Sequence, residues 1–208
     1  MSTSNSGVYT VGHSTHGAEA FLGLLVRHGI GAVADVRSSP FSRFNPQFNR
    51  ETLGQFLKVN GIRYVFLGKE LGARTEDRSC YVDGRVQYDR LARTASFEGG
   101  LDRVLRGAAL YRVALMCAER DPLECHRTIL VAKALAGRGQ QVLHIHADGH
   151  LETHEAAMER LLDVTGLPRK DLFRTREELV AEALARQEHR IAYVDGEQAG
   201  MTLRDERP

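Results

Sequence analysis

Short apolar segments that alternate with helical patterns are the feature that most constrains the fold of this chain. Five segments rich in aliphatic residues end at glycine or at polar residues, and they span 8–12, 32–36, 63–67, 111–117 and 141–146. Helical patterns fill most of the intervals between them, at 18–28, 52–60, 89–106 and 122–136. Strands that alternate with helices favour a mostly parallel sheet that is covered on both faces. We therefore predict an α/β fold with a mostly parallel five-stranded sheet.

The last part of the chain changes character, because amphipathic helical patterns follow one another without an intervening strand. Two such helices are predicted at 152–165 and 174–190, and residues 191–194 form either a short strand or the end of the domain. A chain of 208 residues is long enough for one sizeable core and short for two. We predict one α/β domain over 8–195 with these helices packed on its sheet, and flexible ends at 1–7 and 196–208.

Composition excludes several classes of protein. The 28 basic residues nearly balance the 27 acidic ones, so no overall nucleic-acid footprint is present. No apolar run approaches the roughly 18–20 residues of a membrane span, and the polar start of the chain lacks the apolar centre of a signal peptide. Three cysteines form no disulfide framework. These features predict a reduced, cytoplasmic protein without a membrane partner, and they do not predict its oligomeric state.

The densest chemical pattern lies at the junction between the fourth strand and the following helix. Cys117 and Glu119 come at the end of an apolar strand, and Cys125, His126 and Arg127 come within the first turns of the predicted helix. In open α/β sheets such junctions are where ligands bind. Because a helix N-terminus favours anions and thiolates, the pKa of Cys125 is predicted to be depressed. Cys80, in contrast, lies in a polar loop outside any pattern.

Polar residues also follow the other strands, and the carboxyl ends of parallel strands meet at one edge of a sheet. His13 and Ser14 follow the first strand, while Asp35 and Arg37 close the second. Arg43 lies further along the loop after the second strand. We predict that these residues form one site with the strand–helix junction at this edge.

Within this predicted site, the residue types suggest two kinds of role. The candidate catalytic residues are the acids, bases and thiols His13, Asp35, Cys117, Glu119 and Cys125. The candidate substrate-binding residues are Ser14, Arg37, Arg43, His126 and Arg127, whose cations would hold an anion. The alternative for each residue is a structural role, such as a helix cap or a local ion pair.

Several local patterns resemble a bacterial and archaeal family called domain of unknown function 488. The matching patterns, in order along residues 8–195, are Tyr9-Thr-Val-Gly-His-Ser14, Asp35-Val-Arg37 with Pro40 and Ser42-Arg43, Tyr64 before Leu71-Gly72, Met116-Cys-Ala-Glu119 with Cys125-His-Arg127, and Val142 with His144-Ile145. The paired Cys-Ala-Glu and Cys-His-Arg elements are the most specific part. The resemblance implies a single α/β domain with a polar site, but it implies no particular reaction.

The sequence favours an enzyme, a hydrolase or a transferase, that acts on a small anionic or nucleotide-like molecule or on a nucleic-acid end. It contains no Gly-x-Gly-x-x-Gly pattern, Walker motif or Gly-x-Ser-x-Gly elbow, so no cofactor is expected. The seven residues between Cys117 and Cys125 match no standard zinc spacing, and we therefore assign no metal ligand. Two alternatives stay open: a non-catalytic module that binds a ligand or nucleic acid, and a metal or thiol redox protein that uses Cys117 and Cys125.

Overall fold

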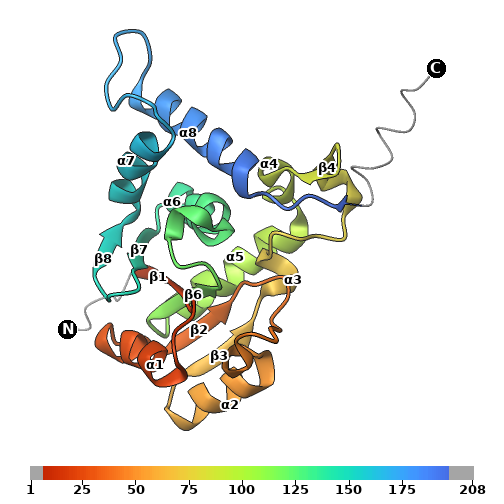
Figure 1. The fold of residues 1–208 in the computed structure, drawn as a ribbon, viewed down its shortest axis with the longest axis vertical. Helices are drawn as coiled ribbons and strands as arrows, with labels where there is room; N and C mark the ends of the chain where they lie inside the picture. The colour runs from red at the N-terminus through yellow and green to blue at the C-terminus, as the bar shows by residue number, and fades with distance from the viewer. Residues whose placement is uncertain (1–6, 197–208) are drawn as a thin grey trace.

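A six-stranded sheet forms the centre of the molecule in the computed structural model, which describes residues 7–196 (Figure 1). Its strands are β1 (Gly7–Gly12), β2 (Ala32–Asp35), β3 (Arg63–Phe66), β6 (Val113–Cys117), β7 (Gln141–Ile145) and β8 (Leu151–Thr153). They are arranged in the order β3-β2-β6-β1-β7-β8. All neighbours pair in parallel except β7 and β8, which are antiparallel. The carboxyl ends of β1, β2 and β6 therefore lie side by side.

Helices cover both faces of this sheet. One face packs against α1 (Ala18–Arg27) and α2 (Arg50–Val59), and a short 3-10 turn, η1 (Pro46–Phe48), adds Phe48 to the same core. The other face packs against α5 (Ala95–Ala108), η4 (Arg127–Ala132), α6 (Lys133–Gly137) and α7 (His154–Val164). Because side chains alternate along a strand, Val113, Leu115 and Cys117 of β6 all point toward this second layer.

A smaller unit lies beside the carboxyl ends of the strands. It contains α3 (Gly68–Leu71), the 3-10 turn η2 (Arg78–Cys80), the antiparallel pair β4 (Tyr81–Val82) and β5 (Arg85–Val86), and α4 (Tyr88–Leu91). Helix α8 (Arg176–Ile191) begins with a capping box at Thr175 and Glu178, crosses α7, and ends next to this unit (Figure 1). Val86 N–H then donates to the carbonyl of Tyr193 at 3.0 Å. The segment after α8 is thereby fixed against β5, and Arg85 of β5 also forms an antiparallel bridge with Val194.

The predicted fold class is confirmed, with two differences. The sheet has six strands because residues 151–153, assigned by the sequence to a loop and the start of a helix, pair with β7. The turn before them places Gly149 at φ +83°, a conformation that glycine adopts without strain. The predicted helix at 89–106 is divided into α4 and α5. The flexible ends predicted at 1–7 and 196–208 fall mostly on 1–6 and 197–208, which lie outside the described residues.

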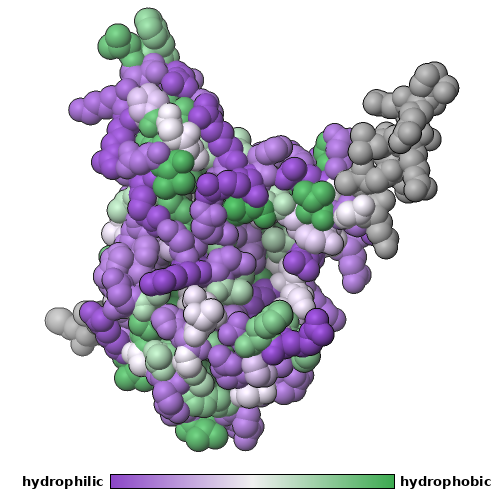
Figure 2. Space-filling model, viewed as in Figure 1, coloured by the Kyte–Doolittle hydropathy of each residue, from purple (hydrophilic) through white to green (hydrophobic). Residues whose placement is uncertain are grey.

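The surface in the view of Figure 2 is mainly hydrophilic, with scattered apolar side chains. The loop between α7 and α8 exposes Leu172 and Phe173, which are 95% and 94% accessible. Among residues 7–196, no helix combines the length and the apolar character that a bilayer crossing requires.

Candidate functional site

The helix predicted at 122–136 is interrupted at Cys125, and this break creates the site. Asp121 caps a 3-10 turn, η3 (Pro122–Glu124), by accepting a hydrogen bond from Leu123 N–H at 2.8 Å. Cys125 is then extended, with φ −139° and ψ 139°. Its carbonyl accepts from the N–H groups of Thr128 and Ile129, and its Sγ accepts from Arg127 N–H at 3.4 Å. Cys125 is therefore the extended residue directly before the helical residue His126, after which the chain continues as η4 (Arg127–Ala132), a π-helical turn.

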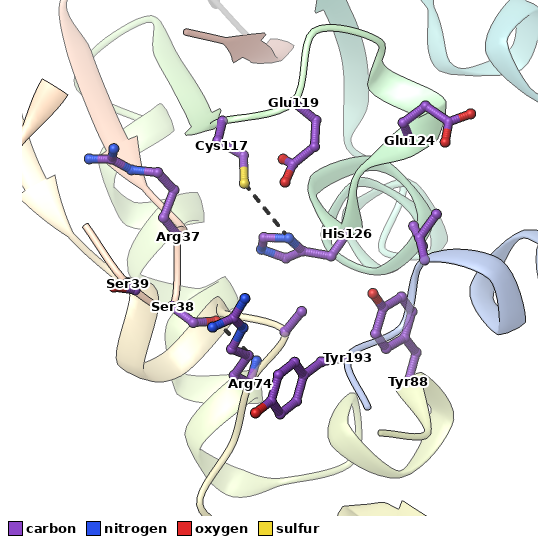
Figure 3. A pocket seen from close by; sticks show the side chains of 13 residues that line it. Arg37, Ser38, Ser39, Arg74, Tyr88, Cys117, Glu119, Glu124, His126 and Tyr193 are labelled. Atoms are coloured by element: carbon purple, nitrogen blue, oxygen red, sulfur yellow. Dashed lines mark hydrogen bonds between the residues drawn. The ribbon is translucent and has the colours of Figure 1, made fainter. Parts of the chain in front are cut away.

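Two thiols and an imidazole meet at this break, and we call Cys117, Cys125 and His126 the Cys–His cluster. Nδ1 of His126 lies 3.8 Å from Sγ of Cys117 (Figure 3) and 3.8 Å from Sγ of Cys125. The three atoms all lie within 4.8 Å of one another. The exposed fractions are 3%, 1% and 8%, so the cluster is almost dry.

The orientation of the His126 ring is set by a backbone carbonyl. Nε2 of His126 lies 3.0 Å from the carbonyl oxygen of Val36, which can only accept a hydrogen bond. The proton of a neutral ring therefore resides on Nε2, and the lone pair of Nδ1 is directed toward the two sulfur atoms.

The pKa values of the two thiols are displaced in opposite directions. Burial and the neighbouring Cys125 hold the pKa of Cys117 well above its usual range. Burial would also raise the pKa of Cys125, but the hydrogen bond with Cys117 and the charges of Arg127 and His126 outweigh it, so this pKa lies well below the usual range. Burial lowers the pKa of His126, and the opposing effect of Cys125 and Glu119 raises it overall. The thiol with the low pKa, Cys125, is the one predicted from its place at a helix N-terminus.

Glu119 adds a carboxylate to the edge of the cluster. Its Oε2 lies within hydrogen-bond distance of Sγ of Cys125, at 2.8 Å, and no cation within residues 7–196 forms an ion pair with this carboxyl group. Burial and the proximity of Cys125 raise its pKa. Its backbone carbonyl approaches β1 so closely that a Cβ at Gly12 would lie 1.9 Å from it. Only glycine at position 12 allows the loop to take this course.

Arg127 fixes that loop from within the core. Its side chain is completely buried, and it donates to the carbonyls of Glu119 at 2.7 Å and Arg120 at 3.4 Å. No hydrogen-bond partner for its Nε is present among the described residues. Its guanidinium therefore donates hydrogen bonds to the backbone of the loop and is not exposed to solvent.

A second buried network lies behind the cluster, at the carboxyl ends of β1 and β2. Arg37 forms a bidentate ion pair with Asp35 at 2.9 and 2.6 Å and also donates to the carbonyl of Phe48. Asp35 accepts a further hydrogen bond from Tyr64 Oη at 2.7 Å. His13 stacks on Phe48, accepts from Arg37 at Nε2, and donates from Nδ1 to the carbonyl of Ser14. The polar atoms of this network are satisfied by one another.

Of the remaining predicted residues, Ser14 lies beside the network and Arg43 lies apart. Ser14 has φ 46° and donates its N–H to the carbonyl of Ala118 at 2.9 Å, so its backbone ties the end of β1 to the end of β6. Arg43 is exposed on the loop after β2 and does not line the cleft described next.

A cleft of about 270 Å³ opens beside the cluster (Figure 3). The predicted site residues that line it are Arg37, Cys117, Glu119 and His126. Cys125, Arg127, His13 and Asp35 do not line it and lie behind its wall. The structure thus brings the predicted residues other than Arg43 to one edge of the sheet, but only four of them reach the cleft.

The rest of the lining comes from residues that the sequence did not assign to the site: Ser38, Ser39, Ala73, Arg74, Tyr88, Ala118, Glu124, Ile191 and Tyr193. Glu124 lies beside the cluster, whereas Arg74 and Tyr193 lie on the facing wall (Figure 3). The guanidinium of Arg74 lies over the ring of Tyr193, 4.6 Å from its centroid. Within residues 7–196 no carboxylate forms an ion pair with Arg74. The sequence contains one signal for this wall, the glycine at position 72, two residues before Arg74. A Cβ at this position would lie 2.5 Å from Oγ of Ser38. Glycine at position 72 lets the two segments of this wall touch.

Comparison with known proteins gives one match. The model of a family described as "Domain of unknown function DUF488" matches residues 17–134, which include the Cys–His cluster, Glu119 and Arg74 but not Tyr193. No curated protein and no solved structure matches the chain. Because the matched span covers more than half of the sequence, the chain belongs to the DUF488 family.

Proposed function

We propose that this protein is an enzyme, a hydrolase or a transferase, that acts on a small anionic molecule bound in the cleft. The observation that carries the proposal is the polarity of the cleft. Arg74, which forms no ion pair with a carboxylate among residues 7–196, lies on one wall, and the opposite wall carries Glu119 and two members of the Cys–His cluster. Concave sites with a few convergent polar groups are typical of small-molecule binding.

Arg74 is the better anion ligand of the cations near this edge of the sheet. The guanidinium groups of Arg37 and Arg127 already donate to Asp35 and to backbone carbonyls. We assign these two arginines a positioning role, in place of the anion contact that their sequence pattern suggests. Arg74 rests on an aromatic face, which holds its planar group in place while its guanidinium N–H groups donate to no acceptor in the part of the chain that the structure describes. A cleft of this volume and a nearly neutral chain favour a small molecule over a nucleic-acid strand.

Glu119 is the proposed general base. Among the described residues it is the carboxylate beside the cluster without a cationic partner, whereas Glu124, which also lines the cleft, is paired with Arg190. In the proposed reaction Glu119 accepts the proton of a water or of an acceptor hydroxyl while that oxygen bonds to the substrate, and it returns the proton to the leaving group. His13 and Asp35 are assigned to the supporting network, because neither lines the cleft.

The first experiment measures anion binding by thermal shift and calorimetry with inorganic phosphate, sulfate and malonate. We expect the wild type to bind at least one of them and Arg74→Ala to bind it about tenfold or more weakly, as loss of a charge-assisted contact implies. The matched control is Arg106→Ala, which removes an exposed arginine on α5 outside the cleft. A wild type that none of the three anions stabilises would refute the anionic-substrate proposal.

The second experiment separates an enzyme from a binding module. Ester and phosphoester substrates with chromogenic leaving groups are tested on the wild type and on Glu119→Gln. We expect turnover by the wild type and its loss in the variant, with anion binding retained in both. If the wild type binds anions and turns over none of the substrates tested, the non-catalytic alternative is favoured.

A further inference from the structure

We propose that Cys117, Cys125 and His126 bind one zinc ion at the inner end of the cleft. The first argument is geometric. A tetrahedral zinc ion with Zn–S bonds of about 2.3 Å and Zn–N bonds of about 2.0–2.1 Å separates a sulfur ligand from a nitrogen ligand by about 3.6 Å. Both sulfur atoms lie 3.8 Å from Nδ1 of His126. The two observed distances are equal and are close to this sulfur–nitrogen distance, so small side-chain movements would bring the three ligand atoms into tetrahedral positions.

The hydrogen bonds around the cluster are the second argument. Histidines that bind metals commonly donate their other ring N–H to a carbonyl or carboxylate, which fixes the tautomer. Nε2 of His126 makes such a bond to Val36, and it leaves the Nδ1 lone pair directed at the sulfur atoms. Sγ of Cys125 also accepts the N–H of Arg127, and this contact suits a thiolate bound to a metal. The supporting hydrogen bonds for two of the three ligands are thus already in place.

Access and charge are the third argument. Cys117 and His126 line the cleft, so an ion can enter from it, and the fourth ligand position is left on that side. Three protein ligands with one open position are typical of catalytic rather than structural zinc sites. Two thiolates balance the charge of a zinc ion, and the buried guanidinium of Arg127 offsets the carboxylate of Glu119. The proposal deepens the proposed function, because Glu119 would then lie next to a position for a metal-bound water.

The sequence leaves open a metal protein that uses Cys117 and Cys125, but it does not single out this set of ligands, because zinc ligands are usually recognised from short paired spacings. Here one ligand ends a strand, and the other two follow an interrupted helix. The break at Cys125 brings the three residues together.

The experiment measures metal content, cobalt spectra and zinc affinity of the full chain. Metal-free protein is incubated with zinc chloride, desalted and analysed by elemental mass spectrometry, and a chromophoric chelator competes for the metal to give the dissociation constant. We expect one zinc per chain in the wild type. The ligand variants Cys125→Ser and His126→Gln should bind more than about 100-fold more weakly, since even loss of an outer hydrogen-bond partner costs about 10–100-fold. The controls Cys80→Ser and His146→Gln, which lie outside the cluster, should bind as the wild type does.

Cobalt substitution tests the wild type without any variant. The Co²⁺ complex should show thiolate-to-cobalt charge-transfer absorption and the intense visible bands of a tetrahedral site. Absence of both features, a wild type that retains no zinc, or formation of a Cys117–Cys125 disulfide in place of metal binding would overturn the proposal. Failure of the zinc site is distinguishable from failure of the proposed function, because Arg74→Ala should lose anion binding and still retain one zinc per chain.

Discussion

His13 provides a quantitative test of the network behind the cleft. Burial and the charge of Arg37 lower its pKa from 6.5 to about 4, although the hydrogen bond to the Ser14 carbonyl acts in the opposite direction. Nε2 accepts from Arg37, so a second ring proton would replace a hydrogen bond with a repulsion between two cations. The ring is only 3% exposed and cannot turn to solvent without leaving Phe48. His13 should therefore be neutral in the folded protein at neutral pH.

The sign of the resulting pH dependence follows from proton binding in the two states. Between pH 6.5 and about 4 the unfolded chain binds a proton at His13 that the folded protein does not. The stability that the neutral ring contributes is therefore complete above pH 6.5 and is lost as the pH falls through this window. The full difference corresponds to about 3 kcal/mol, and about 2 kcal/mol of it should be lost between about pH 7.5 and about pH 5.

The assay is urea unfolding followed by circular dichroism at these two pH values, with the free energy of unfolding obtained by linear extrapolation. The variant His13→Gln should be less stable than the wild type at the higher pH, because hydrogen bonds and ring stacking are lost. Its further loss on acidification should be smaller than that of the wild type by about 2 kcal/mol. The control His189→Gln, which removes an exposed imidazole, should keep the wild-type dependence. If His13→Gln loses as much stability on acidification as the wild type, the ring is not held neutral and the reasoning is wrong.

Other substitutions test the backbone contacts and the buried ion pair by the same unfolding measurement. Gly12→Ala should destabilise the protein by about 1–3 kcal/mol or more, because the new Cβ meets the Glu119 carbonyl at 1.9 Å. Its control, Gly99→Ala on α5, has no atom within 4 Å of the new Cβ and should stabilise by about 0.5–1 kcal/mol; equal effects of the two would contradict the close-approach argument. Asp35→Asn should cost about 3–5 kcal/mol, because it leaves the buried guanidinium of Arg37 without its carboxylate. A cost below about 1 kcal/mol would show that the pair contributes little to the network.

The sequence predicts the sheet and its functional edge well, because both follow from local patterns. Apolar runs that alternate with helices identify five parallel strands, and the polar residues after them do lie at one edge. The sixth strand was missed because its three residues, Leu-Glu-Thr, carry no apolar alternation and pair only through the turn at Gly149.

The interior of the site was harder to predict, because the chain does not form the continuous helix that the local sequence at 122–136 indicates. Asp121 and Pro122 correctly indicate the start of a helical turn, but that turn ends after three residues. The extended conformation of Cys125 depends on tertiary contacts of its sulfur with Glu119 and with the N–H of Arg127. Arg74 and Tyr193 were missed for a similar reason, since more than a hundred residues separate them and only the folded chain brings them together.

The segment after α8 is attached to β5, and with the last residue of α8 it contributes Ile191 and Tyr193 to the wall of the cleft that faces the Cys–His cluster. Residues 17–134, the span shared with the family, contain the whole Cys–His cluster, whereas Ile191 and Tyr193 on the facing wall come from outside that span. Under the proposed function, the groups assigned to the reaction and to anion binding lie in one stretch of the gene, and a second stretch supplies only part of the facing wall. A chimaera that keeps the first stretch and exchanges the second should retain its type of reaction while it admits molecules of a different shape.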